Sequence, residues 1–235
     1  MASESPVESL ADQIVKIVLA SDNPIDSLAD QIIRKTRKNW KKEEFLPENL
    51  LLDLTQRSIV KAALEATSLS TQDVEDLADF GCGKDVERLG RRLFLILVMM
   101  SEEKEQLSFL KHLRDSGVDD SALPIGFYSG GPFDRQGYLL EDDNRNIPGL
   151  KPKRFPIFAD MTRSNRVLFN SDQWRFLAPV FRSDKFRFQF DKSRIMPYLN
   201  VSPKPVSSGY FGEVSRAEVL AVHVPESLRV SSHSF

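Results

Sequence analysis

A pair of glycines near the end of the chain is the clearest candidate for chemistry. The motif reads Ser207-Ser-Gly-Tyr-Phe-Gly-Glu-Val214, with Gly209 and Gly212 three residues apart. Glycine has no Cβ, so a backbone that carries it can approach a bound phosphate closely. Strand-forming residues flank the glycines, and the pattern predicts a strand-turn-strand that could lie over a phosphate-bearing ligand. An ordinary β-hairpin whose turn happens to hold two glycines is the alternative.

The motif resembles the glycine-rich loop of protein kinases, G-x-G-x-x-G-x-V, whose backbone folds over the phosphates of ATP. Gly209, Gly212 and Val214 match that pattern, and Ser207 stands where the first glycine would be. The resemblance implies that these four residues contact ATP once a complete kinase domain is present. For this chain alone it implies no cofactor.

Two upstream stretches extend the resemblance. Residues 172–181 (DQWRFLAPVF) and 195–199 (IMPYL) are similar to the lead-in to the kinase domain of fungal protein-kinase-like proteins, in which a long helical extension precedes the glycine loop. Residues 223–226 (HVPE) resemble the segment that follows the second kinase strand. The resemblance covers residues 45–235 and is specific only near the C-terminus.

The residues that a kinase needs for catalysis do not follow the motif. A kinase uses a lysine on its third strand, an Asp as base, and an Asp and an Asn for magnesium. The triplet Ala221-Val222-His223 carries a histidine near the place where the lysine is sought, and no H-R-D occurs in the sequence. Asp79-Phe80-Gly81 spells D-F-G but lies upstream of the glycine loop, so we interpret it as a helix end with Gly81 as the C-cap.

We therefore expect no catalytic residues and no phosphoryl transfer by this chain, which stops at Phe235 before a catalytic lobe. The favoured interpretation is a non-catalytic regulatory or interaction region of a protein-kinase-like protein. Its partner would be another protein or the missing kinase domain. The alternative is a fragment of a Ser/Thr protein kinase whose glycine loop binds ATP only in the full-length protein.

Other motifs give weaker signals. Gly81-Cys-Gly-Lys84 lacks the first glycine and the Ser/Thr of a P-loop. The three histidines, His112, His223 and His233, do not have the spacing of metal ligands, so we expect no metal site. Cys82 is the only cysteine, and we expect a small, partly buried side chain.

A run of basic residues surrounds Trp40, and it comprises Arg34, Lys35, Arg37, Lys38, Lys41 and Lys42. Such a run could be a nuclear-import signal or could bind nucleic acid or anionic lipid. It could equally be a solvated helix C-terminus whose cations complement the helix dipole. The second interpretation is favoured and nucleic-acid binding is not expected, because the surrounding region is acidic.

The composition changes near residue 120. The first 120 residues hold 16 basic and 23 acidic residues, 4 Phe and 3 Pro, and the remainder holds 16 basic and 11 acidic residues, 12 Phe and 10 Pro. Because proline rarely occurs inside helices, the sequence predicts an α+β protein with a helical bundle over residues 1–120. An irregular linker is expected over 121–170. Residues 171–235 are expected to form a short helix at 173–178, capped by Ser171 or Asp172, and a β segment that resembles the start of a kinase small lobe.

The bundle begins with a repeat, because residues 5–16 recur as 23–34. Each copy has a cap residue (Ser5, Asn23) followed by proline, so a helical hairpin is predicted. Its buried faces would hold Leu10, Ile14 and Ile17 in one copy and Leu28 and Ile32 in the other. Further helices are expected over residues 55–66, 71–80, 84–99 and 102–114, with Ser116-Gly117 ending the last.

The helix over 84–99 should be the central buried element, through a stripe of Val86, Leu89, Leu93 and Leu97. Residues 186–190 alternate phenylalanine with polar residues, which predicts a half-buried strand. The longest apolar run, residues 93–100, is shorter than the ~20 residues that span a bilayer, and the acidic N-terminus does not resemble a secretory signal. We therefore expect no membrane span and a cytoplasmic or nuclear protein.

Overall fold

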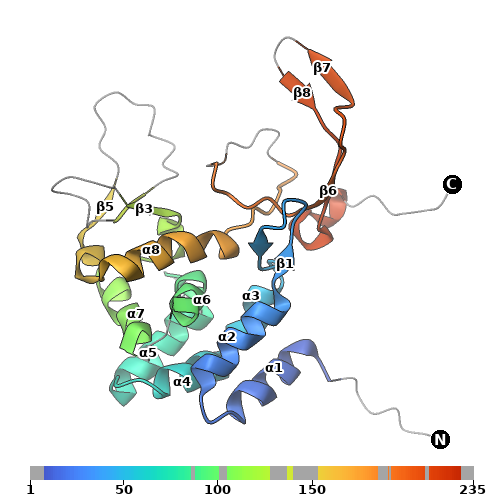
Figure 1. Ribbon diagram of the computed structural model, residues 1–235. Helices are drawn as coiled ribbons and strands as arrows, with labels where there is room; N and C mark the ends of the chain where they lie inside the picture. The colour runs from blue at the N-terminus through green and yellow to red at the C-terminus, as the bar shows by residue number, and fades with distance from the viewer. Residues whose placement is uncertain are drawn as a thin grey trace, which may run out of the picture.

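The computed structural model describes residues 8–85, 88–100, 105–127, 137–139, 153–184, 190, 192–209 and 212–228. The fold is mixed α+β (Figure 1). Its α-helices are α1 (Leu10–Leu19), α2 (Pro24–Lys35), α3 (Leu50–Leu54), α4 (Arg57–Glu65), α5 (Thr71–Cys82), α6 (Arg91–Met100), α7 (Glu105–Asp115) and α8 (Arg163–Asp172). Its 3-10 turns are η1 (Asp120–Ala122), η2 (Pro156–Asp160), η3 (Gln173–Phe176), η4 (Ala221–His223) and η5 (Glu226–Leu228).

Within the described residues the strands form four small antiparallel groups. One pairs β1 (Arg37–Lys38) with β2 (Glu44–Phe45), and a second joins β3 (Ile125–Phe127), β4 (Gly137–Leu139) and β5 (Arg154–Phe155) in that order. The third pairs β6 (Tyr198–Val201) with β9 (Ala217–Val219), and the fourth pairs β7 (Ser207–Gly209) with β8 (Gly212–Val214).

A single cluster of buried apolar side chains runs from Ile14 to Phe176 and joins α1–α8 to the three-stranded sheet. Helix α6 lies at its centre, since residues 93–98 are all buried. The prediction that this helix is the central buried element is confirmed. Among the described residues, no helix has the length and apolar character needed to cross a membrane.

The repeated segments form two helices that pack together, but the copies differ in detail. Asn23 occupies the N-cap position of α2 and Pro24 the first helical position, as predicted, but the Asn23 side chain makes no capping hydrogen bond. Helix α1 instead begins at Leu10, where the Ser9 hydroxyl accepts the Asp12 N–H, and Ser5 lies outside the described residues. The expected burial of Leu28 and Ile32 is confirmed.

The buried face of α1 differs from the prediction at one position, where Val18 is buried in place of Ile17. Ile17 is 48% exposed and Val18 is fully buried, because Leu10, Ile14 and Val18 follow one another in steps of four along a single face. The prediction for Ile17 is therefore wrong. The same face carries the contact of α1 with α2 and α4.

Three helix boundaries also differ from the predictions. Helix α4 starts at Arg57 instead of residue 55, because the separate helix α3 ends just before it. Helix α5 extends to Cys82, and its C-cap is Gly83, with φ of 71°, and not Gly81. Gly81 lies inside the helix, where an added Cβ would be only 2.8 Å from Val60 Cγ1.

Helix α6 begins at Arg91, well after the predicted start at residue 84. Gly90 packs against the ring of Phe80 so closely that an added Cβ would lie 2.1 Å from Phe80 Cε1. Leu89 is 45% exposed and is not part of the buried stripe, and Val86 lies outside the described residues. Helix α7 is followed by Gly117 with φ of 72°, so the expected end at Ser116-Gly117 is confirmed.

The prediction of an irregular linker over 121–170 is wrong where this stretch is described. Phe127 on β3, Phe158 on η2 and Phe169 on α8 pack edge to face, with ring centroids 5.2–6.3 Å apart. The amide of Gln173 closes this unit, because it accepts the Ile125 N–H and donates to the Ile125 carbonyl, both at 2.8 Å. Buried aromatic rings thus bring ordered structure to a stretch whose sequence is dominated by turn residues.

The short helix expected at 173–178 is the 3-10 turn η3, which continues directly from α8. Asp172 makes no side-chain cap for it, so that expectation is wrong, and Ser171 lies within α8. The strand expected over 186–190 falls on residues of which only 190 is described.

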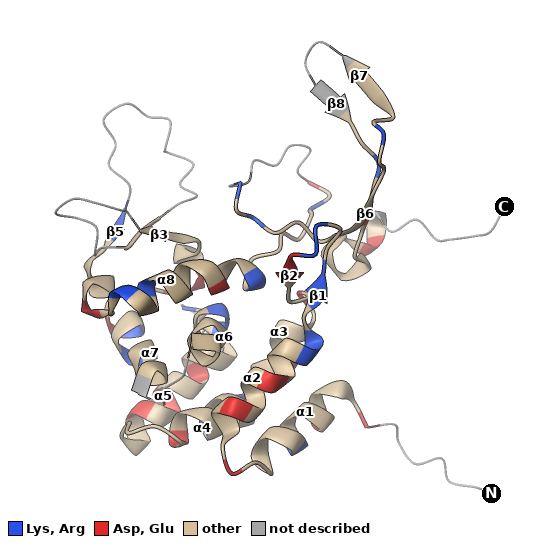
Figure 2. Cartoon of the chain, in the orientation of Figure 1, with Lys and Arg blue, Asp and Glu red and all other residues tan. Residues whose placement is uncertain are grey.

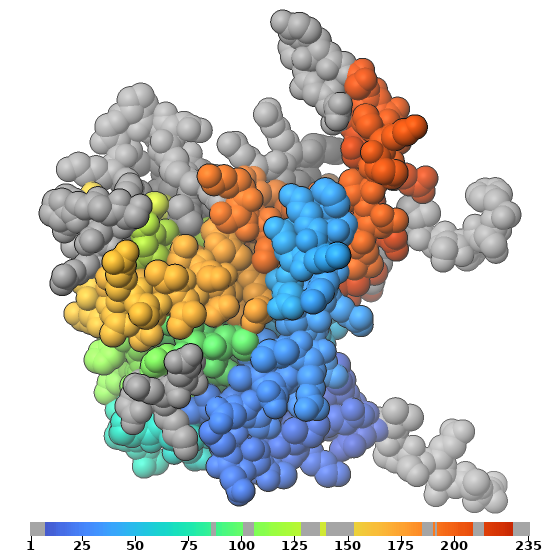
Figure 3. Space-filling model, viewed as in Figure 1, coloured from blue at the N-terminus to red at the C-terminus, as the bar shows by residue number. Residues whose placement is uncertain are grey.

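The strands β6–β9 form an extended arm that rises from the helical body, and Figures 1 and 3 show its orange and red segments standing away from the helices. Below, "the body" means residues 8–184 as far as they are described, and "the arm" means residues 198–219.

Candidate functional site

The glycine motif forms the outer hairpin of the arm. Ser207 pairs with Val214, Ser208 with Glu213 and Gly209 with Gly212 in an antiparallel register. Residues 210 and 211, which join the two strands, are outside the described residues. The expected pair of strands is present, and both interpretations of the motif share such a hairpin.

The arm continues below this hairpin towards the body. Tyr198 pairs with Val219 and Val201 with Ala217. Between the two ladders the Ser202 N–H donates to the Arg216 carbonyl and the Val206 N–H to the Val214 carbonyl, at 2.8 Å each. The four candidate residues Ser207, Gly209, Gly212 and Val214 therefore lie together at the outer end of a nearly continuous two-stranded arm.

A buried histidine that directly follows the arm, His223 in η4, joins the arm to the body. The Glu48 N–H donates to His223 Nε2 at 3.3 Å, so the proton is on Nδ1, which donates to the Pro179 carbonyl at 3.0 Å. The ring also meets Phe45 edge to face, with centroids 5.6 Å apart. Burial holds the pKa of His223 below its ordinary value of 6.5, against the opposing effects of the Pro179 carbonyl and Glu48.

His223 also lies near the position at which a kinase would carry the lysine of its third strand. The triplet Ala221-Val222-His223 is the 3-10 turn η4 and not a strand. The His223 carbonyl accepts the Phe181 N–H at 2.9 Å, so backbone and ring both face the body. His223 is a structural anchor in this position.

Glu48 connects the anchor to the centre of the body. Arg92 Nη2 donates to both Glu48 oxygens at 2.7 and 2.8 Å, and Arg92 Nε donates to the Phe176 carbonyl. At the start of α6, the Asp120 carboxylate accepts the backbone N–H groups of Arg92 and Leu93. Burial raises the pKa of Asp120 to about 6, although those two hydrogen bonds favour its charged form.

A cavity of about 360 Å³ lies beside this network, lined in part by Arg91, Leu89 and Val222. Its size is within the range of ligand pockets, ~300–1,000 Å³. The charged side chains that line it already have hydrogen-bond partners within the protein, however. The partners of Arg92 and Asp120 are given above, and Arg91 Nε donates to the Cys82 carbonyl at 2.9 Å. We interpret the network as the joint between body and arm.

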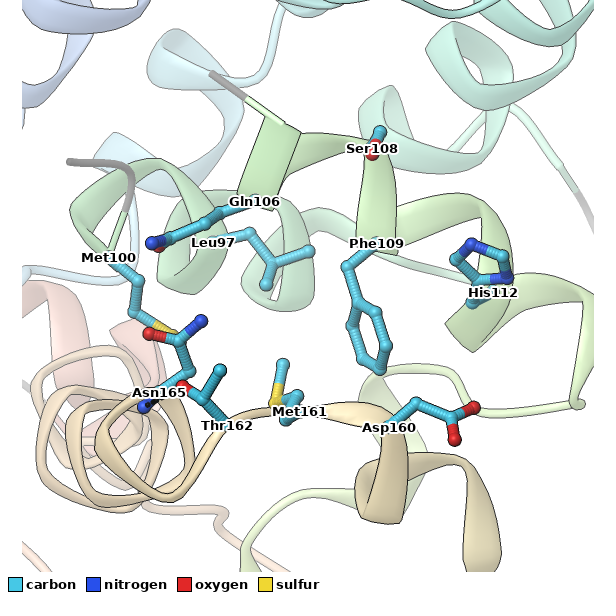
Figure 4. A pocket seen from close by; sticks show the side chains of 10 residues that line it. All are labelled: Leu97, Met100, Gln106, Ser108, Phe109, His112, Asp160, Met161, Thr162 and Asn165. Carbon is cyan, nitrogen blue, oxygen red and sulfur yellow. Dashed lines mark hydrogen bonds between the residues drawn. The ribbon is translucent and has the colours of Figure 1, made fainter. Parts of the chain in front are cut away.

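A second cavity lies between α6, α7 and the start of α8 (Figure 4). Leu97, Phe109 and Met161 cross its middle, and His112 and Asp160 lie at one end. Its volume is about 230 Å³, below the usual range for small-molecule sites, ~300 Å³ and above. The arrangement suits a packing void between helices better than a binding site.

The remaining sequence motifs have structural roles where they are described, and the ring of His112 packs against Phe109 with centroids 5.8 Å apart. Phe80 and Gly81 lie inside the last turn of α5, and Cys82 is buried, more fully than the partial burial that was predicted. His112 is exposed on α7, and His233 is outside the described residues. In the described part of the chain, no group of three or more His, Cys, Asp or Glu side chains is placed to hold a metal ion.

The basic run is divided between two elements. Arg34 and Lys35 form the last turn of α2, whereas Arg37, Lys41 and Lys42 lie on the β1–β2 hairpin that follows. The Trp40 side chain at the turn is 48% exposed. The backbone N–H of Trp40 donates to the Tyr198 carbonyl at the base of the arm. Figure 2 shows the blue Lys and Arg positions at the end of α2, on β1 and along the lower arm.

These five cations contrast with those of α4. None of them takes part in an ion pair among the described residues, and Lys38 pairs with Glu44 at 3.6 Å. On α4, by comparison, Arg57 binds Glu75 and Asp79 and Lys61 binds Glu75, all at 2.5–2.6 Å. The helix-terminus interpretation of the run therefore accounts for Arg34 and Lys35 and not for the cations of the hairpin.

Comparisons with protein-family models, with curated proteins and with solved structures found no match to this chain. The site is therefore interpreted from its own geometry. Sequence reasoning found the glycine motif and the basic run but missed the anchor. His223 and Glu48 are 175 residues apart, and nothing in the local sequence of either marks the other as its partner.

Proposed function

We propose that this chain is a non-catalytic regulatory or interaction region of a protein-kinase-like protein. Its helical body would set the position of the glycine hairpin. The observation that carries the proposal is the His223 anchor, which ties the arm to both Glu48 and Pro179 of the body. A hairpin attached in this way has a defined place relative to the helices without being part of their core.

The hairpin offers a surface for a further strand. Among the described residues β7 and β8 pair only with each other, so each has a second edge with backbone groups that can pair. A kinase small lobe, supplied by a longer form of the protein or by a partner, would add its strand to such an edge. The helical body would then influence that lobe through Glu48, Arg92 and His223.

The alternative is a fragment of a Ser/Thr protein kinase that binds ATP only in the full-length protein. The feature that favours it is the opposed pair Gly209 and Gly212, which leaves the last paired position of the two strands free of Cβ atoms. Under this alternative, Ser207 and Val214 would flank the phosphates, and the lysine and acidic residues would come from the added lobe.

Nucleotide titration of this chain distinguishes the two. We expect no saturable binding of ATP, with or without magnesium, measured by isothermal titration calorimetry. The same titration on a product extended by the codons that follow Phe235 in the source nucleotide sequence provides the comparison. Saturable binding there, abolished by Gly212→Val, together with lysine, H-R-D and D-F-G in order, would establish the alternative. Transfer of a labelled γ-phosphoryl group by this chain alone would overturn both.

A further inference from the structure

The basic hairpin has features that the proposed function does not use. By "the basic hairpin" we mean residues 34–42, with its five cations that lack ion pairs among the described residues, Arg34, Lys35, Arg37, Lys41 and Lys42. Two acidic side chains adjoin it, but both are engaged. Glu43 accepts from Asn39 Nδ2 at 2.9 Å, and Glu44 is placed between Lys38 and Arg175. Residues 34–44 hold six basic and two acidic residues, so the local charge is positive on a chain of net charge −2.

The turn of the hairpin is held in one conformation. Asn39 Oδ1 accepts the N–H groups of Lys41 and Glu43 at 2.9 Å each, and Lys42 takes a positive φ of 65°. Asn39 Nδ2 also donates to the Met196 carbonyl, which fixes the turn against the base of the arm. The cations are thus presented by a pre-organised backbone, which reduces the entropy lost when they bind a partner.

Apolar side chains are exposed among these cations. Trp40 is 48% exposed, and Ile33, in the last turn of α2, is 56% exposed. An exposed indole beside lysines is typical of groups that sit at the boundary between lipid headgroups and acyl chains. Contacts with phosphates alone would not require Ile33.

The shape of the site also argues against nucleic acid. Single strands are bound in positively charged grooves with several aromatic rings on which successive bases stack. Here the cations lie at the end of α2 and on the hairpin that follows it, and neither of the two cavities described above includes any of them. Trp40 is the only aromatic residue of the run, and Lys41 Nζ lies 5.3 Å from its ring centroid.

We infer that the basic hairpin is a docking site for an anionic membrane surface. In this arrangement the cations lie among lipid phosphates and carboxylates, and Trp40 and Ile33 enter the headgroup layer. The contact is peripheral, because the apolar part of the surface is small. It would bring the base of the arm close to the membrane, since Trp40 and Tyr198 are joined by a hydrogen bond.

Vesicle co-sedimentation of the whole chain tests this inference. We expect binding to vesicles of 30% phosphatidylserine in phosphatidylcholine, little binding to phosphatidylcholine alone, and loss of binding at high salt. Lys41→Glu/Lys42→Glu should weaken binding by at least about thirtyfold, because each lost cation contributes about fivefold and the two added carboxylates are repelled by the anionic surface. The matched control Lys16→Glu/Arg163→Glu makes the same change in net charge at exposed positions on α1 and α8 and should retain binding.

Tryptophan fluorescence gives a second readout. The other tryptophan, Trp174, is 8% exposed, so a blue shift on vesicle addition reports on Trp40. The shift should vanish in Trp40→Phe while most binding remains, and Trp40→Ala should weaken binding several-fold. The urea midpoint of each variant verifies that the fold is intact.

Three results would overturn the inference. They are no binding by the unmodified chain at low salt, equal loss in the Lys16→Glu/Arg163→Glu control, or tighter binding of single-stranded RNA than of vesicles at the same ionic strength. The last would make the basic hairpin a nucleic-acid interface instead. None of these results depends on the kinase-like proposal, which concerns the opposite end of the arm.

Discussion

The body and the arm are held together by different interactions. Buried apolar side chains from Ile14 to Phe176 form the core of the body, and none of the described residues of 198–219 belongs to it. The arm is attached by a few local contacts: hydrogen bonds such as Trp40 to Tyr198 and His223 to Glu48 and Pro179, and the stacking of Tyr198 on Phe181. Apolar burial is cooperative over the whole core, whereas a few local contacts can open by themselves. The arm is therefore the part that a partner can move at low energetic cost.

The largest effect is expected from the core of the body. Phe94 on α6 is fully buried, and its Cβ lies close to Gly81 of α5. Phe94→Ala should lower the free energy of unfolding by about 3–5 kcal/mol, because it removes buried area and leaves a cavity. Urea unfolding followed by far-UV circular dichroism measures this.

The matched control for that substitution is Leu52→Ala on α3, because Leu52 is 56% exposed. It should change the free energy of unfolding by less than about 0.5 kcal/mol. Equal effects of the two substitutions would show that the core is not organised around α6.

The next largest effect is expected at the anchor and should be confined to the arm. His223→Ala removes the acceptor of the Glu48 N–H and the donor to the Pro179 carbonyl. Leaving these two buried backbone groups unpaired should weaken the attachment of the arm to the body by about 1–3 kcal/mol. Hydrogen exchange over residues 198–219 should accelerate accordingly, while the amides of α6 keep their protection.

His112→Ala, at an exposed position on α7, serves as the control for the anchor. It should leave exchange in the arm unchanged. If His223→Ala lowers protection in α6 as much as in the arm, body and arm unfold as one unit and the distinction between them is lost.

The stability of the body and the attachment of the arm should respond to pH with opposite signs. Asp120 has a pKa raised to about 6, so the folded body binds a proton more readily than the unfolded chain does, and stability should fall as pH rises from about 4 to 6. The effect should reach up to about 2 kcal/mol and be absent in Asp120→Asn. Because the pKa of His223 is lowered, attachment of the arm should instead weaken as pH falls below 6.5.

Urea unfolding of the wild-type chain and Asp120→Asn between pH 4.5 and 7 measures the first response, and hydrogen exchange of the arm measures the second. The difference between the two chains isolates Asp120 from carboxylates such as Glu75, whose pKa is lowered by Lys61 and Arg57. Slopes of the same sign for body and arm would contradict the assignment of these two groups to separate units.

Local chemistry explains which parts of the fold the sequence predicts. Asn23 and Pro24 mark the start of α2, and Gly117 follows the end of α7, because caps and turns depend on adjacent residues. The burial of α6 follows from its apolar residues. The predictions fail where tertiary packing determines the structure. Gly90 packs against Phe80 and α6 begins only after it, and the aromatic cluster around Phe158 orders part of the predicted linker.

The candidate site divides in the same way. The pair of strands around Gly209 and Gly212 follows from local residue types, and so does the concentration of charge around Trp40. The attachment of the arm does not, because it joins residues such as Glu48 and His223 that only the folded chain brings together. Whether a cation has an acidic partner is likewise a property of the fold. Arg57 and Arg37 look equivalent in sequence, yet only Arg57 has an ion pair among the residues that the structure describes.

The smallest effect is expected in the arm itself. Val214 pairs with Ser207 in the glycine hairpin and is 60% exposed. Val214→Ala should change the free energy of unfolding of the body by less than about 0.5 kcal/mol, because a side chain outside the core contributes little to global stability. It should still speed hydrogen exchange within β7 and β8, since alanine has a lower strand propensity than valine. A global loss comparable to that of Phe94→Ala would mean that the arm contributes to the core after all, and a partner could not then move it without unfolding the helices.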